Sequence, residues 1–228
     1  MPSKHHHTTR WWRAVWWACA ATWGLSAWAY PGAGQWTYKV SGQTRGIPYT
    51  AQANLEWQPQ GHRYTARMEI KAFLVGARRQ VSEGTLAGHE LQPQLFTDQR
   101  KHTKRVVLDT AQRVVRFEET GQQAPLPAGT QDRLSLFFHL GHKLGSVGGH
   151  GVGQRWAVPV VGATDIETWT FVVQHGDAPG QWRLSRLPRH GGDQTLDIWY
   201  GKEPAGVPLR IRLTAPDGDQ ADQVLVAP

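Results

Sequence analysis

The most constraining feature of this sequence is the regular alternation of apolar and polar side chains along much of the chain. Apolar side chains occupy every second position from Tyr64 to Leu74, and charged or hydroxyl side chains stand between most of them. Successive side chains of a β-strand point to opposite faces, so this pattern predicts a long strand with one buried face. Residues 36–40, 195–200 and 209–213 alternate in the same way.

Turn signals rich in glycine, proline and aspartate separate these segments, as at Pro59-Gln60-Gly61 and Pro216-Asp217-Gly218. Further strands are expected near residues 47–57, 79–86, 91–97, 103–109, 112–118, 155–161, 166–173, 181–187 and 221–226. Closely spaced strands without intervening helices are typical of antiparallel architectures. The sequence therefore predicts a mainly β fold, in which a curved antiparallel sheet forms an open barrel or a sandwich.

One segment near the middle of the chain departs from this pattern and predicts a single central helix over about residues 131–144. Its apolar side chains approximate helical spacing: Leu134, Phe137, Phe138, Leu140 and Leu144. We expect Thr130 to cap the helix, and Asp132 would then lie in the first turn, where the helix dipole favours an anion. The expected arrangement is one apolar helix packed on the curved sheet.

The first 29 residues are expected to form a secretory signal peptide. Basic residues precede an apolar stretch at residues 14–28, and no acidic residue occurs before Glu56. This arrangement, ending in a small-residue motif, predicts cleavage after Ala29 and leaves residues 30–228 as a single exported β-rich domain in the periplasm. The apolar stretch is shorter than the ~20 residues of a spanning helix. An uncleaved N-terminal anchor in the inner membrane is the alternative.

Charge and cysteine content narrow the possible functions of the mature domain. The chain has 25 Lys+Arg, 18 Asp+Glu and a net charge of +7. Three basic residues lie in the expected signal peptide, so the mature domain carries 22 minus 18, or +4. This small excess predicts no nucleic-acid partner. The single cysteine, Cys19, also lies in the signal peptide, so no disulfide or thiol chemistry is expected.

Motifs for catalysis, cofactors and metals are not recognised in the sequence. It contains neither a Gly-x-Ser-x-Gly nucleophile elbow nor a phosphate-binding loop with its lysine and hydroxyl. His139 and His142 would share a helix face, but carboxylate or cysteine ligands are not near them in sequence, so a polar helix face is favoured over zinc. Asp165 and Glu167 are expected at a strand edge or in solvent. The expectation is a protein without catalytic residues, metal or cofactor.

Several short blocks of the mature chain are distinctive: Trp36–Val40, Gly129–Ser135, Gly162–Trp169, Leu196–Tyr200 and Val207–Ile211. With these blocks the sequence resembles the exported bacterial domain-of-unknown-function 3108 family, over essentially all of the mature chain. The resemblance implies an exported envelope protein and implies no activity or catalytic residues. At the level of fold the chain is also similar to the lipoprotein-carrier group, in which a curved sheet is partly closed around a helix.

The most distinctive polar cluster in these blocks is formed by Asp132, Arg133 and Ser135. In one interpretation, Asp132 or Arg133 binds a polar head group at the mouth of a cavity. In the other, Asp132 caps backbone amides at the helix start while Arg133 pairs with a strand carboxylate. The aromatic residues Trp169 and Trp199 are candidates for stacking on a ligand, although buried aromatic side chains more often belong to a core.

A basic run at residues 100–105 is a second candidate contact surface. It could touch anionic lipid head groups or another envelope polymer, with a salt-sensitive interaction. Alternatively it is a charged hairpin tip that keeps a sheet edge soluble. Contact with the membrane would be peripheral at most.

Three functional hypotheses follow. The first is non-catalytic binding of an apolar or amphipathic, lipid-like ligand, or an envelope component, in a concave sheet, which requires an apolar cavity of roughly 300–1,000 Å³. The second is an envelope assembly or structural factor that acts through protein–protein contacts, with a filled core and an exposed patch or edge. The third is a hydrolase with an unrecognised site, which requires a polar cleft with convergent titratable groups.

Overall fold

The computed structural model describes residues 30–72, 76–88, 90–146 and 151–226, which form one helix and fifteen strands. The elements in chain order are β1 (Gly34–Thr44), β2 (Ile47–Gln60), β3 (Arg63–Ala72), β4 (Gly76–Ala87), β5 (Glu90–Gln99), β6 (Thr103–Asp109), β7 (Val114–Phe117), β8 (Gln122–Pro125), β9 (Gln131–Asp132), α1 (Ser135–Ser146), β10 (Arg155–Val161), β11 (Ile166–His175), β12 (Trp182–Arg186), β13 (Thr195–Tyr200), β14 (Pro208–Thr214) and β15 (Gln220–Leu225). The expected mainly β fold is confirmed.

All fifteen strands of the described chain belong to one continuous sheet, ordered β8-β7-β6-β5-β4-β3-β2-β1-β15-β14-β13-β12-β11-β10-β9. Strands β1–β8 form an antiparallel N-terminal arm, and strands β10–β15 form an antiparallel C-terminal arm. The arms are joined where β1 pairs with β15, with Tyr38 opposite Leu225. Of the alternatives expected from the sequence, the structure adopts the open, curved sheet rather than the sandwich.

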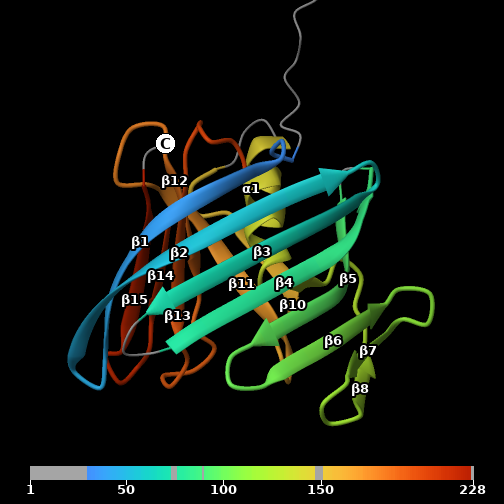
Figure 1. Cartoon of the computed structure of the whole chain (residues 1–228). Helices are drawn as coiled ribbons and strands as arrows, with labels where there is room; N and C mark the ends of the chain where they lie inside the picture. The colour runs from blue at the N-terminus through green and yellow to red at the C-terminus, as the bar shows by residue number, and fades with distance from the viewer. Residues whose placement is uncertain (1–29, 73–75, 89, 147–150, 227–228) are drawn as a thin grey trace, which may run out of the picture.

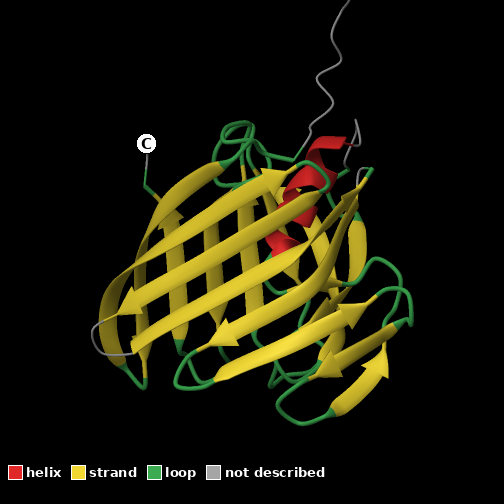
Figure 2. Cartoon of the chain, turned by 45° about the vertical axis from the view of Figure 1, so that its right-hand side comes forward, coloured by secondary structure: helices red, strands yellow, loops and turns green. Residues whose placement is uncertain are grey.

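The sheet curls around the helix, as Figures 1 and 2 show, with α1 lying between the two arms. The edge strand β9 approaches β5, and the Gln131 side-chain amide donates a hydrogen bond of 2.9 Å to the carbonyl oxygen of Leu91. The arms therefore come close without pairing as strands there, and the sheet stays open. Strands β6–β8 continue beyond this contact and extend away from the helix (Figure 1).

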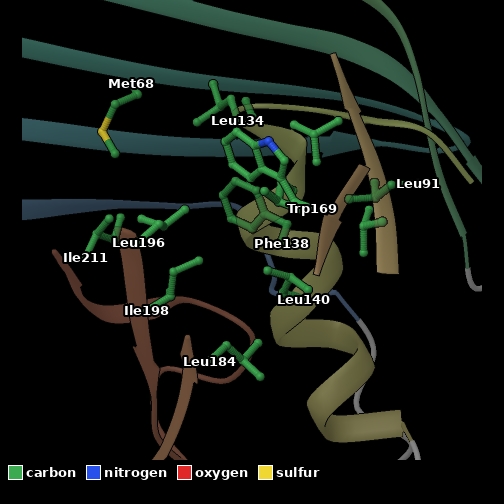
Figure 3. Close-up of a cluster of buried hydrophobic side chains, with 14 of the residues drawn as sticks. Met68, Leu91, Leu134, Phe138, Leu140, Trp169, Leu184, Leu196, Ile198 and Ile211 are labelled. Atoms are coloured by element: carbon green, nitrogen blue, oxygen red, sulfur yellow. The ribbon is translucent and has the colours of Figure 1, made fainter. Parts of the chain in front are cut away.

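Large side chains fill the concave side of the sheet. Both arms and the helix supply fully buried aromatic residues, among them Trp57, Tyr38, Tyr64, Phe96, Phe138 and Phe171. Figure 3 shows Phe138 and Leu140 of α1 between apolar side chains of the two arms, such as Leu91 and Ile198. Burying an apolar side chain of this size contributes about 1.5–3 kcal/mol, so the helix and the two arms stabilise one another.

The helix begins at Ser135 and ends at Ser146, whereas the sequence pattern predicted about 131–144. The expected start was wrong because Gln131 and Asp132 form the short strand β9, which pairs in parallel with Val160 and Val161 of β10. A two-residue parallel pairing leaves no periodic signature in the sequence. The expected cap Thr130 also lies outside the helix, and its hydroxyl donates to the carbonyl oxygen of Pro127 at 2.7 Å.

Glycine in the middle of α1 has a packing reason. A Cβ atom at Gly141 would lie 2.4 Å from the carbonyl oxygen of Gly206, in the loop between β13 and β14. The loop backbone therefore approaches the helix at a distance that only glycine allows. Nearby, His142 is buried and stacks on Tyr30 with ring centroids 4.2 Å apart. The expected polar helix face at this histidine was wrong, because the N-terminal segment covers it.

The first described residues dock on the core. The Trp57 indole donates a hydrogen bond of 2.9 Å to the carbonyl oxygen of Pro31. The expected signal peptide at residues 1–29 lies outside the described residues, as do Leu74 and part of the glycine-rich run after the helix. Within the described part of the chain, no helix is long and apolar enough to cross a membrane.

Candidate functional site

The start of α1 is held by a reciprocal pair of side chains, Asp132 and Ser135. One carboxylate oxygen of Asp132 accepts hydrogen bonds of 2.8 Å from the backbone amides of Leu134 and Ser135. In return, the Ser135 hydroxyl accepts a hydrogen bond of 2.9 Å from the Asp132 amide. This is a capping-box arrangement, which satisfies amides that a helix start otherwise leaves unpaired. Capping, one of the two interpretations of Asp132, is therefore its structural role.

A buried chain of hydroxyl groups connects this cap to the N-terminal arm. The other oxygen of Asp132 accepts a hydrogen bond of 2.5 Å from Ser82 of β4. The Ser82 hydroxyl lies 3.0 Å from the hydroxyl of Tyr64 on β3. Because Ser82 donates to Asp132, Tyr64 is left to donate to Ser82. The three side chains thus link the helix to two strands of the sheet.

Burial is the main influence on the pKa values of Asp132 and Tyr64. Desolvation raises the pKa of Asp132 from 3.8 to about 6, although the hydrogen bonds from Ser82 and the backbone amides act in the opposite direction. Desolvation, with a smaller contribution from the charge of Asp132, also raises the pKa of Tyr64. Asp132 and Ser82 have no exposed surface and Tyr64 is only 2% exposed. A substrate cannot reach these three side chains, so we interpret their hydrogen-bonded network as structural.

Arg133 points away from this buried chain and joins the start of the helix to the C-terminal arm. Its guanidinium lies 3.3 Å from the carboxylate of Asp165, just before β11, and 5.7 Å from the ring centre of Trp169. A Cβ atom at Gly162 would lie 2.1 Å from that carboxylate and 2.7 Å from the guanidinium. Glycine at 162 therefore leaves the space in which the ion pair sits. Two of the sequence blocks, Gly129–Ser135 and Gly162–Trp169, meet at this point.

Around Trp169 the C-terminal arm carries a dense charged network. Arg186 stacks over the Trp169 ring at 4.3 Å and binds both carboxylate oxygens of Asp193, at 3.0 and 2.8 Å. Glu167 accepts a hydrogen bond of 2.9 Å from the Trp169 indole and pairs with Arg189 at 2.9 Å. Burial opposes the ionisation of Glu167, but these contacts outweigh it and hold its pKa below the usual range. Trp169 is therefore a packed and paired residue, 9% exposed.

Across the open side of the sheet, the N-terminal arm presents a second charged group. Arg78 of β4 binds Asp98 of β5 through two hydrogen bonds, of 2.9 and 2.5 Å. Arg100 follows Asp98 at the end of β5, and its pKa is lowered mainly by the positive charge of Arg78, then by burial and by the charge of Arg133. The pairing of Arg79 with Gln99 sets Arg100 beside Arg78, and Asp132, which precedes Arg133, binds Ser82 of the same strand β4. We call Arg78, Asp98, Arg100, Arg133 and Asp165 the mouth cluster.

Trp199 lies elsewhere. It belongs to β13 but faces the convex side of the sheet, opposite to its core neighbours Ile198 and Tyr200. Three guanidinium groups cover its ring, with Arg210 at 4.9 Å, Arg212 at 5.7 Å and Arg183 at 5.9 Å. The structure thus brings Asp132, Arg133, Ser135 and Trp169 together and leaves Trp199 apart on the other face.

Two depressions of the described surface also lie on the convex side. One, of about 400 Å³, is lined by residues of β4–β6, including Arg79, Leu95 and Arg105. The other, of about 410 Å³, lies over β1–β4 and includes Trp36, Glu56 and Arg67. Both are lined by a mixture of apolar and charged side chains. Among the described residues, no group of three or more histidine, cysteine or acidic side chains is arranged to hold a metal ion.

Sequence reasoning missed several members of this site. Ser82, Arg78 and Arg186 occupy ordinary positions in alternating strands. The curling of the sheet brings Ser82 to the start of the helix, whereas the pairing of neighbouring strands brings Arg78 to Asp98 and Arg186 to Trp169. One interpretation of the basic run at residues 100–105 was a hairpin tip, and the structure places residues 100–102 in the turn from β5 to β6 and residues 103–105 at the start of β6. Its first arginine was a detectable signal for the mouth cluster.

Together, the fold and the site define a β-rich domain in which a curved, open antiparallel sheet holds one capped helix. The chain belongs to the family described as "Protein of unknown function (DUF3108)", whose model matches residues 37–225. The family expected from the sequence blocks is thus confirmed. No curated protein matches the chain. A solved structure with a similar arrangement is a β-barrel-like protein of the domain of unknown function DUF1849 from Brucella abortus, with 11% identity, a TM-score of 0.45 and coverage of 87% of this chain and 97% of that chain.

Proposed function

We propose that this protein is an exported, non-catalytic component of the cell envelope that binds an envelope partner through its surface. One observation carries the proposal: the concave side of the sheet is occupied by α1 and by fully buried side chains such as Trp57, Phe138 and Phe171. A carrier that encloses its ligand needs an apolar cavity there. The filled interior leaves the surface as the place of contact, as expected for an assembly or structural factor.

The open side of the sheet is the surface we propose for this contact. There the mouth cluster and the adjoining hairpin between β5 and β6 project charged groups from both arms toward solvent. Arg133 and Arg78 are partly exposed, and Lys101 at the hairpin is exposed. Charged rims of this kind steer association and set specificity more than they add affinity.

Site-specific photocrosslinking in the envelope of living cells tests the proposal. A photoreactive amino acid at Lys101 is expected to capture a discrete envelope component. The matched control is the same amino acid at Lys202, an exposed position in the loop beside the C-terminal half of α1. Equal capture from both positions, or none from Lys101, would count against contact at the open side.

The competing function is carriage of an apolar or amphipathic ligand on the concave face. It requires α1 to leave the sheet, because Leu134, Phe138 and Leu140 occupy that face. Native mass spectrometry of the protein purified from the periplasm, followed by solvent extraction and lipid analysis, separates the two functions. Surface binding predicts the bare mass of residues 30–228 with no extracted lipid. A stoichiometric lipid would overturn surface binding and favour the carrier.

A further inference from the structure

Three arginine residues from separate segments lie near one another at the open side of the sheet. Arg78 on β4 and Arg100 after β5 are neighbours across the paired strands, next to the register pair of Arg79 and Gln99. Arg133 directly follows Asp132, whose carboxylate binds Ser82 on the same strand as Arg78. The side chains of Arg78 and Arg133 are 28% and 37% exposed, and Arg100 is an exposed residue. Like charges that lie close together repel one another, and nearby anions reduce this unfavourable free energy.

The carboxylates of the protein compensate this group only in part. Asp98 is engaged by Arg78 in a two-point contact, and Asp165 makes a single, longer contact of 3.3 Å with Arg133. Arg100 forms no ion pair within 4 Å in the described part of the chain. The cluster thus contains three guanidinium groups and two carboxylates, and both carboxylates already pair with an arginine. The positive charge of Arg100 is therefore not balanced within the cluster.

We infer that Arg78, Arg100 and Arg133 bind a phosphate group of the envelope partner at the open side of the sheet. A phosphate offers three acceptor oxygens and up to two negative charges, which suits planar guanidinium forks approaching from different segments. A carboxylate has only two oxygens in one plane, and the protein already supplies two of these groups. This inference rests on the proposed function, since it names the chemistry by which the partner is recognised.

The phosphate can belong to a lipid head group or to a free phosphate compound, and two probes separate these sources. Isothermal titration with glycerol 3-phosphate measures binding of a free phosphate monoester. Flotation with vesicles of phosphatidylcholine, with and without phosphatidic acid, measures binding of the same group on a membrane. Binding in both assays is expected to weaken as salt is added, because the contact surface is partly exposed.

The variants Arg100→Gln and Arg133→Gln are each expected to weaken binding about tenfold, the loss that corresponds to about 1.4 kcal/mol for one charge-assisted contact. Arg155→Gln is the matched control, because Arg155 is an exposed arginine on β10 outside the mouth cluster. Arg100→Gln removes no ion pair among the described residues, so it keeps the test valid if Arg133→Gln loses stability. Circular dichroism and the urea midpoint verify folding of each variant.

The two assays distinguish the possible sources of the phosphate. If glycerol 3-phosphate binds and Arg100→Gln weakens that binding, the ligand is a free phosphate compound. If the protein binds only vesicles that contain phosphatidic acid, the ligand is a lipid head group. Absence of binding to both probes, or equal losses in Arg155→Gln, overturns the inference. If crosslinking at Lys101 still captures a component while both probes fail, the proposed function stands and only the phosphate inference falls.

Discussion

Replacing the buried carboxylate at the start of α1 gives the sharpest test of how this fold is held together. We predict that Asp132→Ala is less stable than Asp132→Asn by about 2–4 kcal/mol, which is a large share of the typical total of about 5–15 kcal/mol. Comparing two neutral side chains removes the cost of ionising a buried group from the difference. What remains is the set of hydrogen bonds that an amide keeps and a methyl group loses.

The magnitude follows from the contacts of Asp132. Its carboxylate accepts from two backbone amides at 2.8 Å, and loss of such a cap costs about 1 kcal/mol. It also accepts from Ser82, and a buried hydroxyl left without its partner costs about 1–3 kcal/mol. An asparagine carbonyl can accept from the two amides while its NH₂ group donates to Ser82. The alanine variant loses all three contacts.

Urea unfolding followed by tryptophan fluorescence at pH 7 measures this difference, because the Trp57 ring lies 4.4 Å from that of Phe138 on the helix. The slope of unfolding free energy against urea should be the same for both variants, so that the midpoints report stability alone. A difference below about 0.5 kcal/mol, within the range of an ordinary surface substitution, would refute a structural role for the buried cap.

Three further predictions concern the same framework. First, because burial raises the pKa of Asp132 to about 6, the folded state binds more protons than the unfolded state between about pH 4 and 6. The wild type should therefore lose about 3 kcal/mol of stability relative to Asp132→Asn as the pH rises through this window. The same stability difference between the two proteins at pH 4 and pH 7, measured by urea unfolding, would contradict this prediction. Second, Gly141→Ala should lower stability by about 1–3 kcal/mol, measured by thermal unfolding, because the new methyl group meets a loop carbonyl; unchanged or raised stability would mean that the loop yields. Third, Gly162→Ala should displace the flexible ion pair between Arg133 and Asp165 at a stability cost below about 1 kcal/mol, while weakening binding of glycerol 3-phosphate; retained binding would show that this ion pair does not position the arginine.

Most strands could be predicted because each has one face in the core and one in solvent. The segment from Arg63 onward is a clear case: Tyr64, Ala66 and Met68 are buried, and the residues between them are more exposed. Strand β8 was missed because Gln122–Pro125 is short and largely exposed, so burial imposes no alternation on it. Strand β9 was missed because two residues cannot show a period.

The candidate site was predictable only in part. The block around Asp132 and Arg133 was identified, and both contacts expected in the structural interpretation, a helix cap and an ion pair, occur. The partner Ser82 was not predictable, since it is fifty residues away in sequence and looks like any buried serine of a strand. Trp169 and Trp199 could not be distinguished from sequence, because alternation assigns a face of the sheet without showing what covers it.

The sequence by itself determined the local features of this protein: the strands with two unlike faces, the central apolar helix, the acidic cap and the block composition that marks the family. These features depend on neighbouring residues, which the order of amino acids specifies directly. Tertiary structure alone decided that one sheet curls until β9 meets β5, that the helix fills the concave side, and that the segment with Arg133 meets the strands that carry Arg78 and Arg100. Curvature accumulates over many strands and depends on long-range packing, so no single stretch of sequence encodes it.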